Sequence, residues 1–122
     1  IYSVQIIMKN RKESKFMDKY TNKLKLLIRE INSYLSLFKT TEILYDIGIN
    51  IQSDYDDLNE NNIANHLFRA MDNSLKTILE IMKLSDKDED ELIDTMQKSV
   101  KEHSDYTDDF IINEIIKKFS NR

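Results

Sequence analysis

Hydrophobic and polar residues follow a helical period over residues 63–82. Apolar residues recur there at steps of three and four, the spacing of one face of an α-helix, over about five turns. Polar residues that water can solvate fill the positions between them. Because a helix with one apolar face must bury it against other helices, we expect this segment to be central to the domain. Its apolar positions are Ile63, Leu67, Ala70, Met71, Leu75, Ile78, Leu79 and Met82.

A second apolar stripe of about six turns predicts a helix over residues 16–38, with Ser14 as its N-cap. Residues 39–41 are expected to end this helix. One of the two threonines at 40 and 41 would then cap a short separate helix through Ile43 and Ile47, with Gly48 as its left-handed C-cap. The apolar positions of the long stripe are Phe16, Tyr20, Leu24, Leu27, Ile28, Ile31, Tyr34, Leu35 and Phe38.

Two shorter helices are expected after residue 84. Ser85 is a typical N-cap and is followed by acidic residues, which the positive end of a helix dipole favours. Thr107 is expected to cap the last helix. The buried positions are predicted to be Leu92, Ile93, Met96 and Val100 in the first helix, and Phe110 or Ile111, Ile112, Ile115, Ile116 and Phe119 in the second.

These elements predict an all-α fold: a compact antiparallel bundle of four longer helices plus one short helix. The single Gly and the lack of Pro support this class, since tight turns between strands need such residues. We expect residues 1–122 to form one helical domain. The chain begins at Ile1, which suggests an excised domain, and residues 1–10 are expected to be a helical or extended lead-in.

The sequence offers little chemistry. It has no cysteine, and no apolar run reaches the ~20 residues that cross a bilayer. The acidic run from Asp86 starts like a calcium loop, but Glu91 and Gln97 stand where such a loop needs Gly and Glu. His66 and His103 have no His or carboxylate four residues further on. We therefore expect no catalysis, no metal site and no cofactor.

Charge is unevenly distributed along the chain. Residues 9–30 contain eight basic and three acidic residues, a charge of +5. Because the net charge of the chain is −4, the remaining residues carry a charge of −9. Four of these basic residues recur every fourth position beside the apolar stripe and could follow a phosphate backbone or an anionic membrane surface. The alternative is a solvated face, or one that faces the acidic later helices. The stripe consists of Arg11, Lys15, Lys19 and Lys23.

The function that we expect is that of a non-catalytic interaction or assembly module, which binds a partner protein or a second copy through apolar helix faces. The first alternative is a nucleic-acid-associated protein that uses the basic stripe, although the pI of 5.2 weighs against it. A further alternative, a host-modulating protein of a virus or parasite, rests only on a composition typical of AT-rich genomes. Loop-flanking tyrosines that could anchor a partner are Tyr45, Tyr55 and Tyr106.

Overall fold

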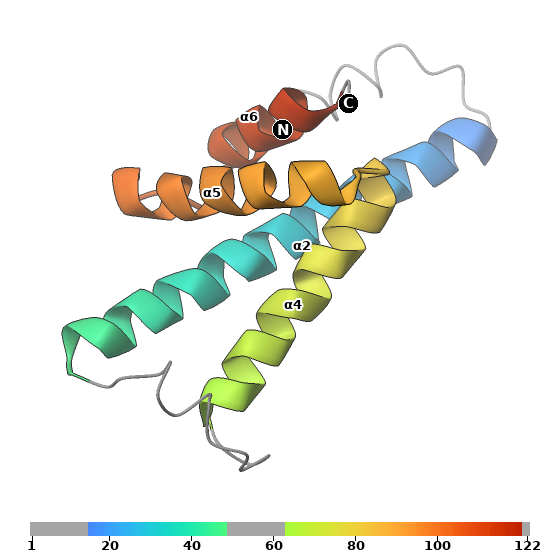
Figure 1. Ribbon diagram of the computed structural model, residues 1–122. Coiled ribbons are helices and arrows are strands. Elements are labelled where there is room, and N and C mark those ends of the chain that lie inside the picture. Colours follow the sequence, from blue (N-terminus) through green and yellow to red (C-terminus); the bar gives the residue numbers. More distant parts are fainter. Residues whose placement is uncertain (1–14, 49–62, 121–122) are drawn as a thin grey trace.

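The computed structural model describes residues 15–48 and 63–120, with side chains from 21 and from 65 onward. The described residues form four helices and no strand, which confirms the all-α class. The helices are α2 (Lys15–Asp46), α4 (Ile63–Met82), α5 (Asp86–Glu102) and α6 (Asp109–Phe119) (Figure 1). The predicted lead-in over residues 1–10 lies outside the described residues.

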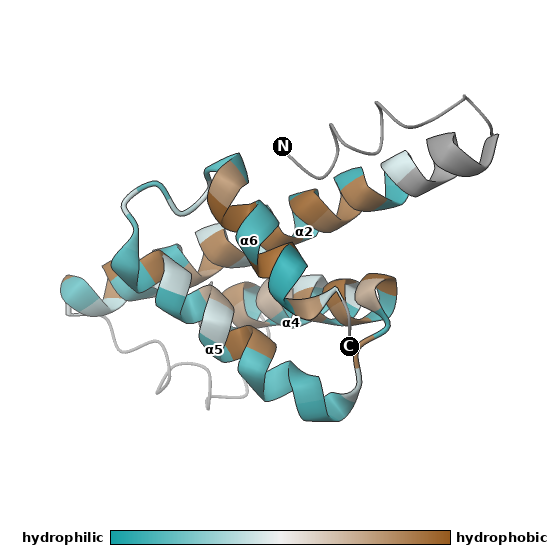
Figure 2. Ribbon diagram, turned by 90° about the horizontal axis from the view of Figure 1, so that it is seen from above, coloured by the Kyte–Doolittle hydropathy of each residue, from teal (hydrophilic) through white to brown (hydrophobic). Residues whose placement is uncertain are grey.

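The helices form two layers that meet along α2. α2 and α4 lie side by side and run in opposite directions, and α5 and α6 lie across one side of this pair (Figures 1 and 2). α2 contacts each of the other three helices, and α5 also contacts α6. The prediction that all the helices together form an antiparallel bundle stays a prediction.

The core is built from the predicted apolar stripes. Ile31 and Leu35 of α2 and Ile78 of α4 have no exposed surface, nor do Leu92 and Met96 of α5. Each of these residues lies at a predicted stripe position, so the 3.6-residue period identified the buried face of each helix. The other buried apolar residues are Leu24, Leu27, Tyr34, Met71, Leu75, Val100, Ile112, Ile115, Ile116 and Phe119.

The separate short helix predicted after residue 41 is not present, because α2 continues unbroken to Asp46. The Thr40 hydroxyl donates to the Ser36 carbonyl at 3.0 Å, and the Thr41 hydroxyl donates to the Phe38 carbonyl at 2.7 Å. Both hydroxyls are therefore satisfied inside the helix and do not cap a new one. Past the end of α2, Gly48 has φ +90°, the left-handed conformation that favours glycine.

The caps of the two shorter helices differ in part from the prediction. Ser85 occupies the N-cap position of α5, but its hydroxyl donates to Asp88 Oδ2 at 3.2 Å and caps no backbone N–H. The N-cap of α6 is Asp108 and not Thr107, since Asp108 Oδ1 accepts from the Phe110 N–H at 2.8 Å. A carboxylate at this position also interacts favourably with the positive end of the helix dipole.

Lys83 forms the corner between α4 and α5 with a positive φ of 56°. The Leu84 N–H donates to the Leu79 carbonyl at 3.0 Å, and the Lys83 N–H donates to the Glu80 carbonyl at 3.3 Å. These two bonds form a Schellman motif, whose left-handed position is usually glycine. Lysine pays a steric penalty there, because its Cβ crowds the following carbonyl.

We therefore predict that Lys83→Gly raises the free energy of unfolding by about 0.5–1 kcal/mol, because glycine adopts this conformation without the steric penalty. Lys76→Gly is the matched control, since Lys76 is exposed inside α4. There the same replacement should lower the free energy of unfolding by about 1 kcal/mol. Urea unfolding followed by circular dichroism measures both values, and a destabilised Lys83→Gly would contradict the assignment.

Tyr34 places a polar group inside the core. Its side chain is buried, and its hydroxyl accepts from Gln97 Nε2 of α5 at 3.3 Å. Burial raises the pKa of the Tyr34 phenol above its ordinary value of 10.0, the hydrogen bond from Gln97 lowers it, and the charge of Asp72 raises it further, for a net increase. Tyr34 thus links α2 to α5 through this hydrogen bond, and it is burial of the phenol that favours its protonated form.

Because the pKa of Tyr34 is higher in the folded than in the unfolded state, its contribution to stability is complete below pH 10 and is lost as the pH rises through the folded-state pKa. We predict that the wild-type protein loses more stability between pH 7 and pH ~11 than Tyr34→Phe does. At pH 7 the variant should be about 0.5–1.5 kcal/mol less stable, because the hydrogen bond is absent. Urea unfolding at both pH values tests this, and equal losses would contradict it.

Candidate functional site

Large apolar side chains are exposed at two places in the described part of the chain. Phe110, in the first turn of α6, is 69% exposed. At the end of α2, Ile43 is 49%, Tyr45 is 44% and Ile47 is 67% exposed. Single exposed apolar residues are common on protein surfaces, so the surroundings of each decide whether it belongs to a site.

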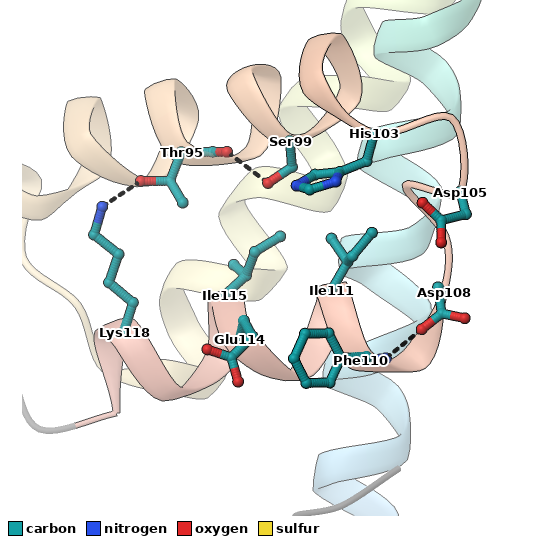
Figure 3. A pocket seen from close by; sticks show the side chains of 10 residues that line it. All are labelled: Thr95, Ser99, His103, Asp105, Asp108, Phe110, Ile111, Glu114, Ile115 and Lys118. Carbon is teal, nitrogen blue, oxygen red and sulfur yellow. Dashed lines mark hydrogen bonds between the residues drawn. The ribbon is translucent and has the colours of Figure 1, made fainter.

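Phe110 lies at the rim of a hollow between α5 and α6, which has a volume of about 520 Å³ (Figure 3). This volume is within the range of pockets that hold a ligand or a short peptide segment. Side chains of α5, of α6 and of the connecting loop line it: Thr95, Ser99, His103, Asp105, Asp108, Phe110, Ile111, Glu114, Ile115 and Lys118.

The floor of the α5–α6 hollow is apolar. Ile111 and Ile115 project from α6 toward α5 (Figure 3). Ile115 is buried and Ile111 is half-buried against the core, so the floor is continuous with the interior. Together with the exposed ring of Phe110, these side chains offer an apolar strip that could pack against a partner side chain.

One end of the hollow is closed by a cation with partners on α5. The Lys118 ammonium donates to Thr95 Oγ1 at 3.1 Å and lies 3.8 Å from a carboxylate oxygen of Glu91. These contacts connect α6 to α5 across the hollow (Figure 3). The charge of Lys118 is thus partly neutralised inside the domain.

The other end of the hollow is acidic. Asp105 and Asp108 lie in the loop at this end, and Glu114 lies on α6 between Phe110 and Lys118 (Figure 3). Glu114 pairs with Lys117 at 3.8 Å, but both side chains are about half exposed, so this ion pair contributes little. Residues 102–116 contain five carboxylates and neither Lys nor Arg. The exposed rim around Phe110 therefore favours a cationic partner.

Ser99, His103 and Asp105 line the same hollow, and serine hydrolases use these three residue types together. Here the Ser99 hydroxyl donates to the Thr95 carbonyl of its own helix at 3.0 Å. No hydrogen bond joins Ser99 to His103, both of which the structure describes, so the nucleophile–base contact of such enzymes is not formed here. Among the side chains that the structure describes, no three of His, Asp or Glu converge closely enough to hold a metal ion.

The end of α2 forms the second exposed apolar surface. The Ile47 N–H donates to the Ile43 carbonyl at 3.1 Å, so these two residues stand one helical turn apart on the same side. Glu42, on the preceding position, lies 3.8 Å from the Lys101 ammonium of α5. This ion pair marks where contact between α2 and α5 gives way to solvent.

The structure describes only some of the residues that the sequence nominated as contact sites. Tyr45 is exposed, as expected for an anchor, whereas Tyr106 is half-buried and packs against the core. Lys23 is exposed on α2. Lys15 and Lys19 belong to α2 without described side chains, and Arg11 and Tyr55 lie outside the described residues.

The sequence offered Phe110 or Ile111 as the first buried position of α6, and the structure half-buries Ile111 and leaves Phe110 exposed. A signal for its exposure was present. The buried apolar residues of α6 lie at 112, 115, 116 and 119, and at 100° per residue position 110 points about 200° away from position 112. No comparable sequence signal indicated that α5, α6 and the loop between them would together line a hollow.

No protein-family model, no curated protein and no solved structure matches this chain. Among the described helices, none combines the length and the apolar character that a membrane crossing requires.

We predict that Phe110→Ala changes the free energy of unfolding by less than about 0.5 kcal/mol, because the ring is mostly exposed. Ile112→Ala, two positions further on the buried side of α6, should lower it by about 2–4 kcal/mol. Urea unfolding of the two variants measures the contrast. A loss of similar size for Phe110→Ala would place its ring in the core and remove it from the surface described above.

Proposed function

We propose that this chain is a non-catalytic interaction or assembly module, built as an antiparallel helical bundle, that binds a partner protein or a second copy of itself. The observation that carries the proposal is the position of Phe110. It is a large aromatic side chain, 69% exposed, at the mouth of a hollow with an apolar floor and an acidic rim. Aromatic residues that fill pockets at the centre of an interface supply much of the binding energy.

Energetics support this use of Phe110. Complete burial of a phenylalanine side chain contributes about 1.5–3 kcal/mol relative to its exposure to water. The folded domain leaves most of that contribution unused at position 110, while Ile112 and Ile116 of the same helix are buried. A partner that covers the ring and the adjoining isoleucines would recover this free energy on binding.

The end of α2 supports the same class of function by a second surface. Ile43 and Ile47 present branched apolar side chains on one side of the last turn, and Tyr45 is exposed beside them. Two anchors separated by one helical turn are typical of surfaces that pack against another helix. Each surface can be tested without the other, because Phe110 and Ile47 are both mostly exposed and lie on different segments of the chain.

Photo-crosslinking tests the proposal. We expect a p-benzoyl-phenylalanine placed at position 110 or at position 47, in protein expressed in its source cells, to form an adduct of defined mass with a partner or a second copy. A bound surface holds its neighbour against the reactive group, which is the physical reason for the adduct. Denaturing gels followed by mass spectrometry detect and identify it.

The control carries the same group at position 76, which is exposed on α4 away from both surfaces. Adducts at 110 or 47 that exceed those at 76, and that consist of the same protein in repeated experiments, support an interaction module. If neither position exceeds the control, both surfaces are solvated in the cell and the proposal fails.

A further inference from the structure

The α5–α6 hollow defines the chemistry of what it can hold. Its floor, made by Ile111 and Ile115, suits branched apolar side chains, and Phe110 stands exposed beside it. Asp105 and Glu114 are exposed on its rim. The complementary occupant is a short segment with apolar residues followed by several cationic ones and no carboxylate.

The first twelve residues of this chain have that composition. Ile6, Ile7 and Met8 are consecutive apolar residues, and Lys9, Arg11 and Lys12 follow within four positions. No acidic residue precedes Glu13. The segment and the acidic stretch 102–116 thus carry opposite charges. The positive charge of the segment continues through residues 9–30, which carry +5 in total.

Residues 11 and 12 of one copy cannot reach the acidic loop of the same copy. Only two residues separate Lys12 from Lys15, the first residue of α2, and three extended residues span at most about 11 Å. The start of α2 and the loop between α5 and α6 lie at opposite ends of the molecule (Figures 1 and 2). α5, which runs between these ends, has 17 residues and is therefore about 25 Å long.

We propose that the α5–α6 hollow binds residues 6–12 of a second copy of this chain. The apolar residues 6–8 pack on Phe110, Ile111 and Ile115, and the cationic residues 9–12 lie against Asp105 and Glu114. When two copies exchange these segments, both hollows are filled and the assembly closes as a dimer. This inference rests on the proposed function as an interaction module and specifies its partner.

Charge reversal on the chain of residues 1–122 tests the pairing. The segment variant carries Lys9→Glu, Arg11→Glu and Lys12→Glu, and the hollow variant carries Asp105→Lys and Glu114→Lys. Asp108 is left unchanged because it caps α6. Each variant alone should self-associate about tenfold more weakly than the wild type, because like charges then face each other. Sedimentation velocity over a wide range of concentration measures this.

An equimolar mixture of the two variants should restore association, since each acidic segment then meets a basic hollow and each basic segment meets an acidic hollow. Fluorescent labelling of one variant shows whether mixed dimers form. A chain that carries all five substitutions should also self-associate. Restoration in that chain but not in the mixture would mean that the segment occupies the hollow of its own copy, which overturns the inference.

The apolar part is tested by Phe110→Ala, which should weaken self-association by about tenfold or more. Lys76→Ala is the matched control, because Lys76 is exposed on α4 outside both apolar surfaces, and it should leave self-association unchanged. If Ile47→Ala weakens association and Phe110→Ala does not, the chain assembles through α2 and the inference fails, while the interaction module stands. If the wild-type chain stays monomeric at every concentration, the inference is overturned. The proposed interaction module would then bind a protein other than a second copy of itself.

Discussion

Every helix of this domain depends on keeping the apolar side of α2 out of water. Among the described helices, α2 makes the most extensive contacts with the others, and its residues Ile31 and Leu35 have no exposed surface. Such a stripe would make an isolated helix of 32 residues aggregate or unfold. Covering it requires α4 on one side and the α5–α6 layer on the other. The hollow between α5 and α6 is a consequence, because those two helices are placed by their contacts with α2 as well as with each other.

The sequence was sufficient to locate the helices because burial imposes a local period on it. The predicted segment 63–82 coincides with α4, and the buried apolar positions of α2 all belong to its predicted stripe. Helix ends were harder, since residues such as threonine satisfy their hydroxyls in more than one way. The hydroxyls of Thr40 and Thr41 donate to carbonyls of the preceding turn of α2. The N-cap of α6, expected at Thr107, is the adjacent Asp108. These choices depend on which arrangement buries more of the neighbouring turn, which local sequence does not specify.

The candidate site was much less predictable than the core. Its lining comes from α5, α6 and the loop between them, so it exists only after the two helices pack. The sequence nominated a basic stripe by its four-residue spacing and three tyrosines by their places beside loops, and the structure packs Tyr106 against the core. Phe110 could have been found, because the positions of Ile112 and Ile116 define the buried side of α6 and exclude it. The periodicity of the sequence could not predict that an acidic loop and an apolar floor would border the same hollow.

The last turn of α2 extends beyond the helices that cover the rest of it. After the contact between Glu42 and Lys101, the turn is held mainly by its own backbone hydrogen bonds, and Ile47 and Gly48 lie in solvent. A helix end with so little burial opens locally at a small free-energy cost, while the core stays closed. The domain therefore combines a fixed body with a terminal turn whose helical and open forms differ little in free energy. A ligand that bound there would mainly lower the conformational entropy of this turn and would leave the shape of the core unaltered.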